Sequence, residues 1–231
     1  MSGLAGIVGA YCSTASSKLA EYGNVATLPQ ISYASTADEL NNFAYFFRTC
    51  WNDEEQAVAL SSIISSQLSI HACALVYKIG DIASESFSYS FRNSYLAGGN
   101  GSAFNHLLFE KGFTDCSSDK KAIAGLVLET GTPCIVITAS YYDTLCLLDE
   151  IYKTSVEADQ LVVFLNTGGD YKESRHQGMN YIDAYNDLNT SFYNKFINLW
   201  KTLNPKMYPD ANGNRNNLES YSAELIDAII R

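Results

Sequence analysis

The chain has 231 residues, which is enough for one large domain or for two lobes of about a hundred residues each. With 47% hydrophobic and 17% charged residues it has the composition of an ordinary globular protein, and no segment approaches the roughly 20 apolar residues of a membrane-spanning helix. The formal net charge of -10 repels phosphate backbones and anionic lipids, which excludes nucleic acid as a partner.

The chain begins with a pattern of strand, helix and strand. An apolar run at residues 4–9 ends in small residues, and a hydroxyl-rich loop follows it, so we predict a strand and then a helix over about 13–22. Gly23 and Asn24 are expected to end this helix, because glycine and asparagine are common just after a helix. Residues 28–33 are predicted to form a second short strand, which completes a βαβ unit.

The alternation of strands and helices then continues. Continuous apolar strands between amphipathic helices favour parallel sheets that are covered on both faces. The further predicted strands are 45–49, 73–79, 104–109, 133–138 and 161–165, and the predicted helices begin near Asp53 and cover about 82–97, 119–130 and 142–155. After Gly168 and Gly169 only helices are expected, at about 180–203 and 218–230, with a loop at 204–217 between them.

The six cysteines include no C-x-x-C pair, which argues against a zinc ribbon and a thioredoxin-type redox site. Their even number permits disulfides but defines no pairing. Asn100 and Asn189 each begin a glycosylation triplet, which would lie at the surface of a secreted chain. Residues 1–20 are rich in glycine and serine and do not have the charged start and apolar stretch of a signal peptide.

The hydroxyl-rich loop at residues 9–17 is the first candidate site. Free N–H groups at a helix N-terminus can bind a small anion such as a carboxylate or a phosphate, although serine and threonine there are also ordinary helix caps. The loop has neither P-loop spacing nor a G-x-G-x-x-G fingerprint. Cys12 lies in it, but no histidine is close in sequence, and we assign no catalytic residue, no metal ligand and no cofactor.

Several segments then resemble one known family, in the right order. Residues 28–40 (LPQISYASTADEL) closely resemble the I-P-Q-I-S-Y-A-S/T-x-x-x-L segment of the metabotropic glutamate receptor ectodomain, a member of the receptor-type ligand-binding family. Residues 46–57 resemble the family's F-x-R…P-S-D-x-x-Q-A, and residues 7–17 resemble its V-I-G-P-x-S-S-S. Residues 84–87 and 221–228 are similar to its G-E-S helix start and to its Y-x-A-x-x-x-D-A helix.

This resemblance implies an α/β fold of the type I periplasmic-binding-protein kind, in which two lobes of parallel sheet flanked by helices enclose the ligand. On that basis residues 1–66 are part of a first lobe that is incomplete at the N-terminus. Residues 67–175 form the second lobe, and residues 176–231 are a helical segment that returns toward the first lobe.

The resemblance also implies a binding site for an α-amino acid. Matched position by position, Ser13 is the residue expected to bind the ligand carboxylate, with Thr14 beside it. The ligand ammonium is expected to bind to the carbonyl of Ala34, the hydroxyl of Thr36 and the carboxylate of Asp53. Donors opposite a carboxylate and acceptors opposite an ammonium give the charge complementarity that an amino acid needs.

Two positions depart from the family pattern. Ile82 and Ala83 stand where the receptors have a cleft tyrosine, and Thr167 stands where they have an acid. The second-lobe half of the amino-acid site is therefore not supported by the sequence.

The leading hypothesis is a non-enzymatic, extracellular ligand-binding region of a receptor, which binds a small ligand and signals by lobe closure. As part of a larger receptor it would lie on the outer face of the plasma membrane, attached through segments outside this chain, and dimerise through its first lobe. The alternatives are a soluble amino-acid-binding protein of the transporter-associated kind and an α/β enzyme whose serine-rich loop holds a phosphate.

Overall fold

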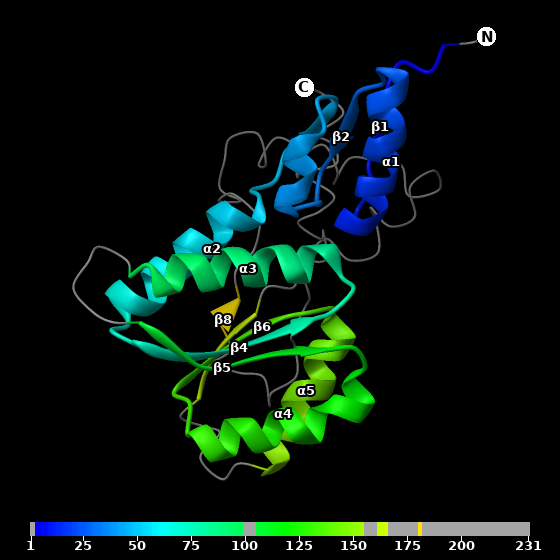
Figure 1. The fold of residues 1–231 in the computed structure, drawn as a ribbon. Coiled ribbons are helices and arrows are strands. Elements are labelled where there is room, and N and C mark those ends of the chain that lie inside the picture. Colours follow the sequence, from blue (N-terminus) through cyan, green and yellow to red (C-terminus); the bar gives the residue numbers. More distant parts are fainter. Residues whose placement is uncertain (1–2, 99–104, 155–160, 166–179, 182–231) are drawn as a thin grey trace, which may run out of the picture. The chain divides into compact units, whose positions relative to one another are not determined.

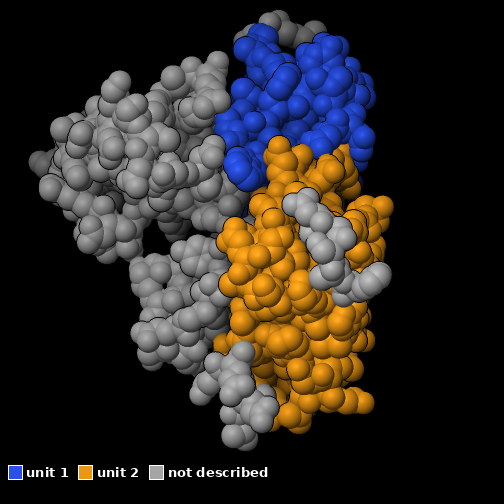
Figure 2. Space-filling view, turned by 90° about the vertical axis from the view of Figure 1, so that its left-hand side faces the viewer, with its two compact units in different colours: residues 1–36, 40–51, 184–231 blue, residues 37–39, 52–183 orange. Residues whose placement is uncertain are grey.

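The computed structural model describes residues 3–98, 105–154, 161–165 and 180–181 (Figure 1). The chain divides into two compact units, which are coloured separately in Figure 2. Unit 1 contains residues 3–36 and 40–51, and unit 2 contains residues 37–39 and the described residues from 52 to 181. Each unit is built on a parallel sheet, so the predicted α/β class is confirmed.

Unit 1 has a three-stranded sheet in the order β1-β2-β3. Helix α1 connects the first two strands, which gives the predicted βαβ unit, and a short 3-10 helix, η1 (Asp38–Asn42), precedes the third strand. The strands are β1 (Ile7–Val8), β2 (Gln30–Ser32) and β3 (Phe46–Arg48), and α1 covers Ser13–Ala26. Both neighbouring pairs are parallel, so their carboxyl ends lie at the same edge.

The predicted end of α1 at Gly23 and Asn24 is wrong, because the helix continues to Ala26. Gly23 is buried, and a Cβ atom there would lie only 2.8 Å from the carbonyl oxygen of Leu28. The glycine therefore serves close packing rather than helix termination. The helix ends instead at Thr27, which has φ 52° and donates its N–H to the Gly23 carbonyl.

Unit 2 has a five-stranded parallel sheet in the order β5-β4-β6-β7-β8. Its strands are β4 (Ala72–Lys78), β5 (His106–Phe113), β6 (Cys134–Thr138), β7 (Val162–Leu165) and β8 (Asn180–Tyr181). Its helices are α2 (Asp53–Ser62), the π-helical turn η2 (Ile63–Gln67), α3 (Ile82–Leu96), α4 (Cys116–Thr130) and α5 (Tyr141–Thr154). The strands predicted from 73 to 165 and the helices between them are all present.

Helices cover both faces of this sheet. Figure 1 shows α2 and α3 on one side of it and α4 and α5 on the other. Side chains of β4 alternate between the faces, so that Cys73 and Leu75 pack with α2 and α3, while Ala74 and Val76 pack with α4 and α5. Because both faces are buried, the central strands are apolar at nearly every position, as the sequence indicated.

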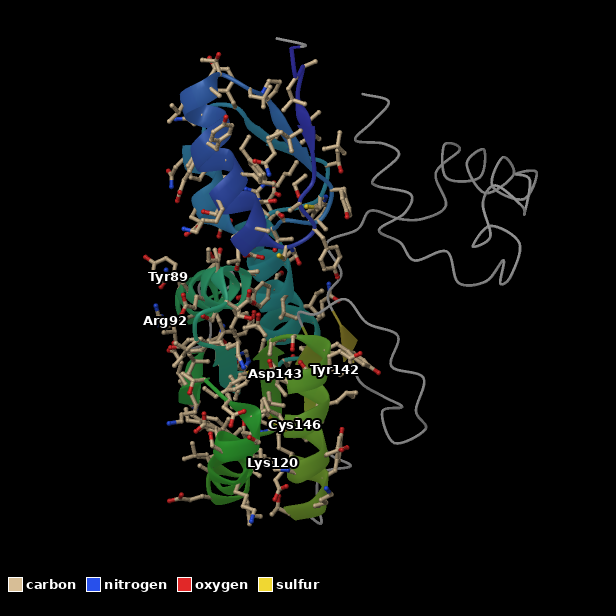
Figure 3. The ribbon with its side chains drawn as sticks, turned by 90° about the vertical axis from the view of Figure 1, so that its right-hand side faces the viewer. Tyr89, Arg92, Lys120, Tyr142, Asp143 and Cys146 are labelled. Atoms are coloured by element: carbon tan, nitrogen blue, oxygen red, sulfur yellow. A yellow bond between two sulfur atoms is a disulfide. The ribbon has the colours of Figure 1, made fainter. Side chains whose placement is uncertain are left out.

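One disulfide joins the two helices on the second face. Cys116 at the start of α4 is bonded to Cys146 in α5 (Figure 3). Lys120 and Glu150 add an ion pair of 3.5 Å between the same helices. The cysteine count permitted this bond, and the packing of α4 beside α5 supplies the pairing that the count left open.

The C-terminal prediction is wrong at its first residues. Asn180 and Tyr181 were predicted to begin a helix, but they are extended and pair in parallel with Phe164 and Leu165 of β7. The remaining helical predictions up to residue 230 lie outside the described residues, as do Asn100, Thr167 and Asn189. In the part of the chain that is described, no helix is long and apolar enough to cross a membrane.

The core of unit 2 gives a first prediction. Phe91 is fully buried and stacks on Phe87 and Tyr95, at ring separations of 6.2 and 5.3 Å. We expect Phe91→Ala to lower the free energy of unfolding by about 3–5 kcal/mol, because it removes a large ring and leaves a cavity. Urea denaturation measures this loss. Tyr89→Ala on the same helix is the matched control, since Tyr89 is 60% exposed and should cost less than about 1 kcal/mol; equal losses would contradict the prediction.

Candidate functional site

The carboxyl ends of β1 and β2 bring together the two loops that the sequence nominated. The loop after β1 leads into α1, whose first two residues are Ser13 and Thr14, and the loop after β2 carries Ala34 and Thr36. All four residues belong to unit 1. Ser13 is buried, Thr14 is exposed, and Ala34 and Thr36 are partly exposed.

A network of serine hydroxyls holds these loops side by side. Ser35 donates to the carbonyl oxygen of Ala10 at 3.1 Å and lies 2.8 Å from the hydroxyl of Ser16 in α1. Ser32 donates to the same carbonyl at 2.7 Å, and its oxygen accepts the backbone N–H of Ser35 at 3.0 Å. Ser16 also accepts the N–H of Ala10 at 3.0 Å. The start of α1 is therefore fixed against the loop after β2 by polar contacts.

Arg48, at the end of β3, fixes the second loop from the other side. Its guanidinium donates to the carbonyl oxygens of Ser35 at 3.1 Å and of Thr36 at 2.6 Å. Its second terminal nitrogen donates to Asn41 at 2.7 Å. Arg48 thus ties the end of β3 to the loop after β2, a role that the planar, multi-donor guanidinium fills well.

Ser16, Ser35 and Arg48 are positioning residues that reasoning from the sequence did not assign. Their only signal was indirect, because each lies inside a segment that resembles the family: the hydroxyl-rich loop, the second strand and the F-x-R motif. Nothing in the residue types reveals that the hydroxyl of residue 35 meets that of residue 16.

The N-terminus of α1 differs from those of the other helices. Its N-cap residue is Cys12, which makes no side-chain capping bond, and its first turn contains no acidic residue. By contrast Asn52, Asp81 and Asp115 cap α2, α3 and α4 with their own side chains. At α4 the hydrogen bond from Ser117 holds the pKa of the Asp115 carboxyl below its usual range. The positive end of the α1 dipole is thus left without an anionic group of its own helix.

Asp53, the fifth predicted site residue, lies in unit 2. It is the first residue of α2 and is 1% exposed. Asn52 caps the helix just before it, with the N–H of Glu55 donating to the Asn52 side chain at 2.8 Å and the N–H of Asn52 donating to Glu55 in return at 3.2 Å. The capping box therefore fixes the backbone conformation at Asp53. Asp53 belongs to a different unit from the other four predicted site residues.

The carboxyl edge of the unit 2 sheet has polar groups of its own. Lys78 at the end of β4 lies 3.2 Å from the carboxylate of Asp143 and 5.1 Å from the centre of the Phe113 ring. Tyr142, the neighbour of Asp143 in the first turn of α5, is 81% exposed (Figure 3). Such edges are where ligands bind in α/β folds, so Tyr142 is an aromatic group available at that edge. Ile82 and Ala83, which replace the family's tyrosine, begin α3.

No described residues form a cluster of histidine, cysteine and acidic side chains that could hold a metal ion. His71 is hydrogen-bonded to Asn105 in unit 2, at 2.9 Å. What the described arrangement offers is hydrogen bonding and charge, which suits reversible binding of a small polar molecule.

Comparison with known proteins agrees with this. A sequence profile described as "receptor family ligand binding region" matches residues 1–229. No curated protein matches the sequence significantly. The fold is shared with a leucine-binding protein, LivK, from Thermotoga maritima, at a TM-score of 0.76 and 17% identity over 98% of this chain and 62% of that protein. The fold is also shared with a substrate-binding protein of an ABC transporter from Desulfitobacterium hafniense, at a TM-score of 0.75 and 18% sequence identity. That match covers 99% of this chain and 63% of the other protein.

The chain therefore spans a little less than two thirds of the length of these two structures. At this identity the likeness concerns the fold, and it confirms the prediction of a periplasmic-binding-protein-like architecture. The predicted lobe boundaries and the five site residues stay predictions, as does the particular closeness to the metabotropic glutamate receptors.

The hydroxyl network gives a second prediction. Ser35→Ala removes the bonds to Ala10 and Ser16, and each hydrogen bond of this kind contributes about 1 kcal/mol. We expect amide hydrogen exchange over residues 9–13 to become about tenfold faster, because the loop opens more often. Ser62→Ala, at an exposed position of α2, is the control and should leave exchange there unchanged. Unchanged exchange in Ser35→Ala would show that the network does not hold the loop.

Proposed function

We propose a function from one premise: the chain belongs to the family of receptor ligand-binding regions. Within that family, we propose that it binds a small α-amino acid and that the edge formed by the loops after β1 and β2 receives the ligand's charged groups. The observation that carries the proposal is the uncapped N-terminus of α1, held beside the loop after β2 by the Ser16–Ser35 contact.

The carboxylate of the ligand is the group that suits the start of α1. The backbone N–H groups of the first turn, together with the hydroxyls of Ser13 and Thr14, are donors at the positive end of a 14-residue helix. A carboxylate there gains charge-assisted hydrogen bonds without any rearrangement of the loop. The same features would also accept a phosphate, which keeps the enzyme hypothesis testable, although both structural relatives are named as binding proteins.

The ammonium group is assigned to the loop after β2 and to an acid. The hydroxyl of Thr36 and the carbonyl oxygen of Ala34 are acceptors on a loop whose course Arg48 fixes. Asp53 is the acid that we propose as the counter-charge, on the strength of its match to the family motif. These assignments predict recognition of the amino-acid backbone; the ligand's side chain is left to other parts of the protein.

Two biological settings are consistent with this chemistry. The sequence segments quoted above favour a receptor, which we place on the outer face of the plasma membrane, dimerising through its first lobe and signalling by lobe closure. The named structural relatives favour a substrate-binding protein of a transporter. Transcript sequence on both sides of this chain separates the two, because a cysteine-rich segment followed by seven apolar spans would support the receptor.

Binding itself is tested by a third prediction. In isothermal titration calorimetry of the protein with a panel of amino acids, at least one is expected to release heat, and Thr36→Val is expected to weaken its binding about tenfold or more. The substitution keeps the shape of the side chain and removes the hydroxyl. Thr114→Val, at an exposed position before α4, is the control and should bind as the parent does. No heat with any amino acid would overturn the proposal.

The role of the acid is tested by a fourth prediction. Asp53→Asn removes one charge without changing the size of a buried side chain, and it is expected to weaken amino-acid binding at least tenfold, because the ammonium loses its counter-charge. Glu54→Gln, the next residue of the same helix and exposed, makes the same charge change and should leave affinity within about twofold. Thermal melts of both variants verify folding. Equal affinities of Asp53→Asn and the parent would remove Asp53 from the site.

A further inference from the structure

Two cysteines lie side by side in the centre of the unit 2 sheet. Cys73 is in β4 and Cys134 begins β6, and these strands are parallel neighbours in which Ala74 pairs with Ile135. The residues just before that pair, Cys73 and Cys134, therefore face each other across the two strands. Both are completely buried, and both belong to the hydrophobic cluster under α2 and α3.

The two thiols lie near enough to shift each other's pKa, and the Tyr95 hydroxyl lies near enough to Cys73 to do the same. The Tyr95 hydroxyl donates to the carbonyl oxygen of Ile70 at 3.1 Å, which fixes the ring, and Tyr95 belongs to the same hydrophobic cluster as the two cysteines. Burial, with the hydrogen bond to Cys73, raises the pKa of Tyr95, so that it stays a neutral phenol.

The spacing of the strands suits a covalent bond. Neighbouring strands of a sheet lie about 4.7–4.9 Å apart, and disulfides join Cα atoms about 4.4–6.8 Å apart. The chain already contains a disulfide, Cys116–Cys146, and disulfides persist in oxidising compartments. Of the other two cysteines, Cys12 and Cys50, neither lies in unit 2.

We propose that Cys73 and Cys134 are a second disulfide site, which closes across β4 and β6 when the folding chain meets a small-molecule disulfide such as oxidised glutathione. The bond would enclose α3, β5 and α4 in one covalent loop and join the two central strands of the sheet. Cross-links that close long loops remove many conformations from the unfolded chain, so the oxidised form is the more stable one.

The chemistry is an ordinary two-step exchange. The thiolate of one cysteine of the pair attacks one sulfur of oxidised glutathione, forms a mixed disulfide and releases one glutathione thiolate. The thiolate of the other cysteine then attacks the protein sulfur of that mixed disulfide, forms the protein disulfide and releases the second glutathione thiolate. Two protein thiols are oxidised, one glutathione disulfide is reduced to two thiols, and the two protons from the cysteines pass to the released thiolates.

In the folded chain the two thiols have opposite pKa shifts. The hydrogen bond with Cys134 lowers the pKa of Cys73, although burial acts in the opposite direction. The hydrogen bond with Cys73 and burial both raise the pKa of Cys134. Because both sulfurs are inaccessible in the folded chain, the exchange takes place before α3 packs on the sheet or when it opens.

Peptide mapping tests the proposal on the intact chain. The protein is reduced and unfolded, refolded in a mixture of reduced and oxidised glutathione, alkylated and digested without reduction. Mass spectrometry is expected to find a cross-linked peptide pair containing Cys73 and Cys134, together with the pair containing Cys116 and Cys146. Recovery of Cys73 and Cys134 as alkylated thiols, with Cys116 and Cys146 linked, would overturn the proposal. So would linkage of either cysteine to any other.

A control variant and a rate measurement complete the test of the Cys73–Cys134 disulfide. The double variant C12S and C50S leaves four cysteines and is expected to give the same two linked pairs, so competing partners in unit 1 cannot explain a negative result. In the folded parent chain, oxidised glutathione is expected to form the Cys73–Cys134 bond slowly, and at least tenfold faster in urea too dilute to unfold the chain, because opening limits access. Equal rates would contradict the buried placement of the pair. Neither outcome depends on ligand binding.

Discussion

All the described strands run parallel within their sheets, and this arrangement governs the rest of the molecule. A parallel sheet is usually covered on both faces, and each pair of parallel strands needs a long crossover connection, most often a helix. It also gathers the carboxyl ends of its strands at one edge, together with the N-termini of the helices that follow them. Apolar core residues therefore lie in the middle of each strand, and polar groups that can meet a ligand lie at its carboxyl end.

This separation explains why much of the fold could be predicted from the sequence. The strands around Leu75 and Val136 are apolar at consecutive positions because both of their faces are buried, and such runs are visible without coordinates. The helix after Asp53 was equally visible from its spacing. Gly23 was misread because the same residue type ends helices and permits close packing, and only the carbonyl of Leu28 beside it distinguishes the two. Tyr181 was misread because a two-residue edge strand has no periodicity to detect.

The candidate site was predictable in its residue types and not in its connections. A serine-rich loop at a helix start indicates donors, and the resemblance to a family identified Ser13 and Thr36 as counterparts of binding residues. The contacts that fix those loops, from Ser35 to Ser16 and from Arg48 to Thr36, join residues far apart in sequence. The Cys116–Cys146 pairing is of the same kind, because it depends on how two helices pack.

The described part of unit 1 shows what such a site requires of its surroundings. Near the carboxyl ends of β1 and β2 the buried side chains include five serines: Ser13, Ser16, Ser17, Ser32 and Ser35. A buried polar group is costly unless it is hydrogen-bonded, so these residues stabilise the fold only in the arrangement that satisfies them. That same requirement favours one conformation of the loops. An edge built from apolar contacts would tolerate many arrangements, whereas this network fixes the donors of α1 and the acceptors after β2 in place, so that binding of the proposed ligand would cost little reorganisation.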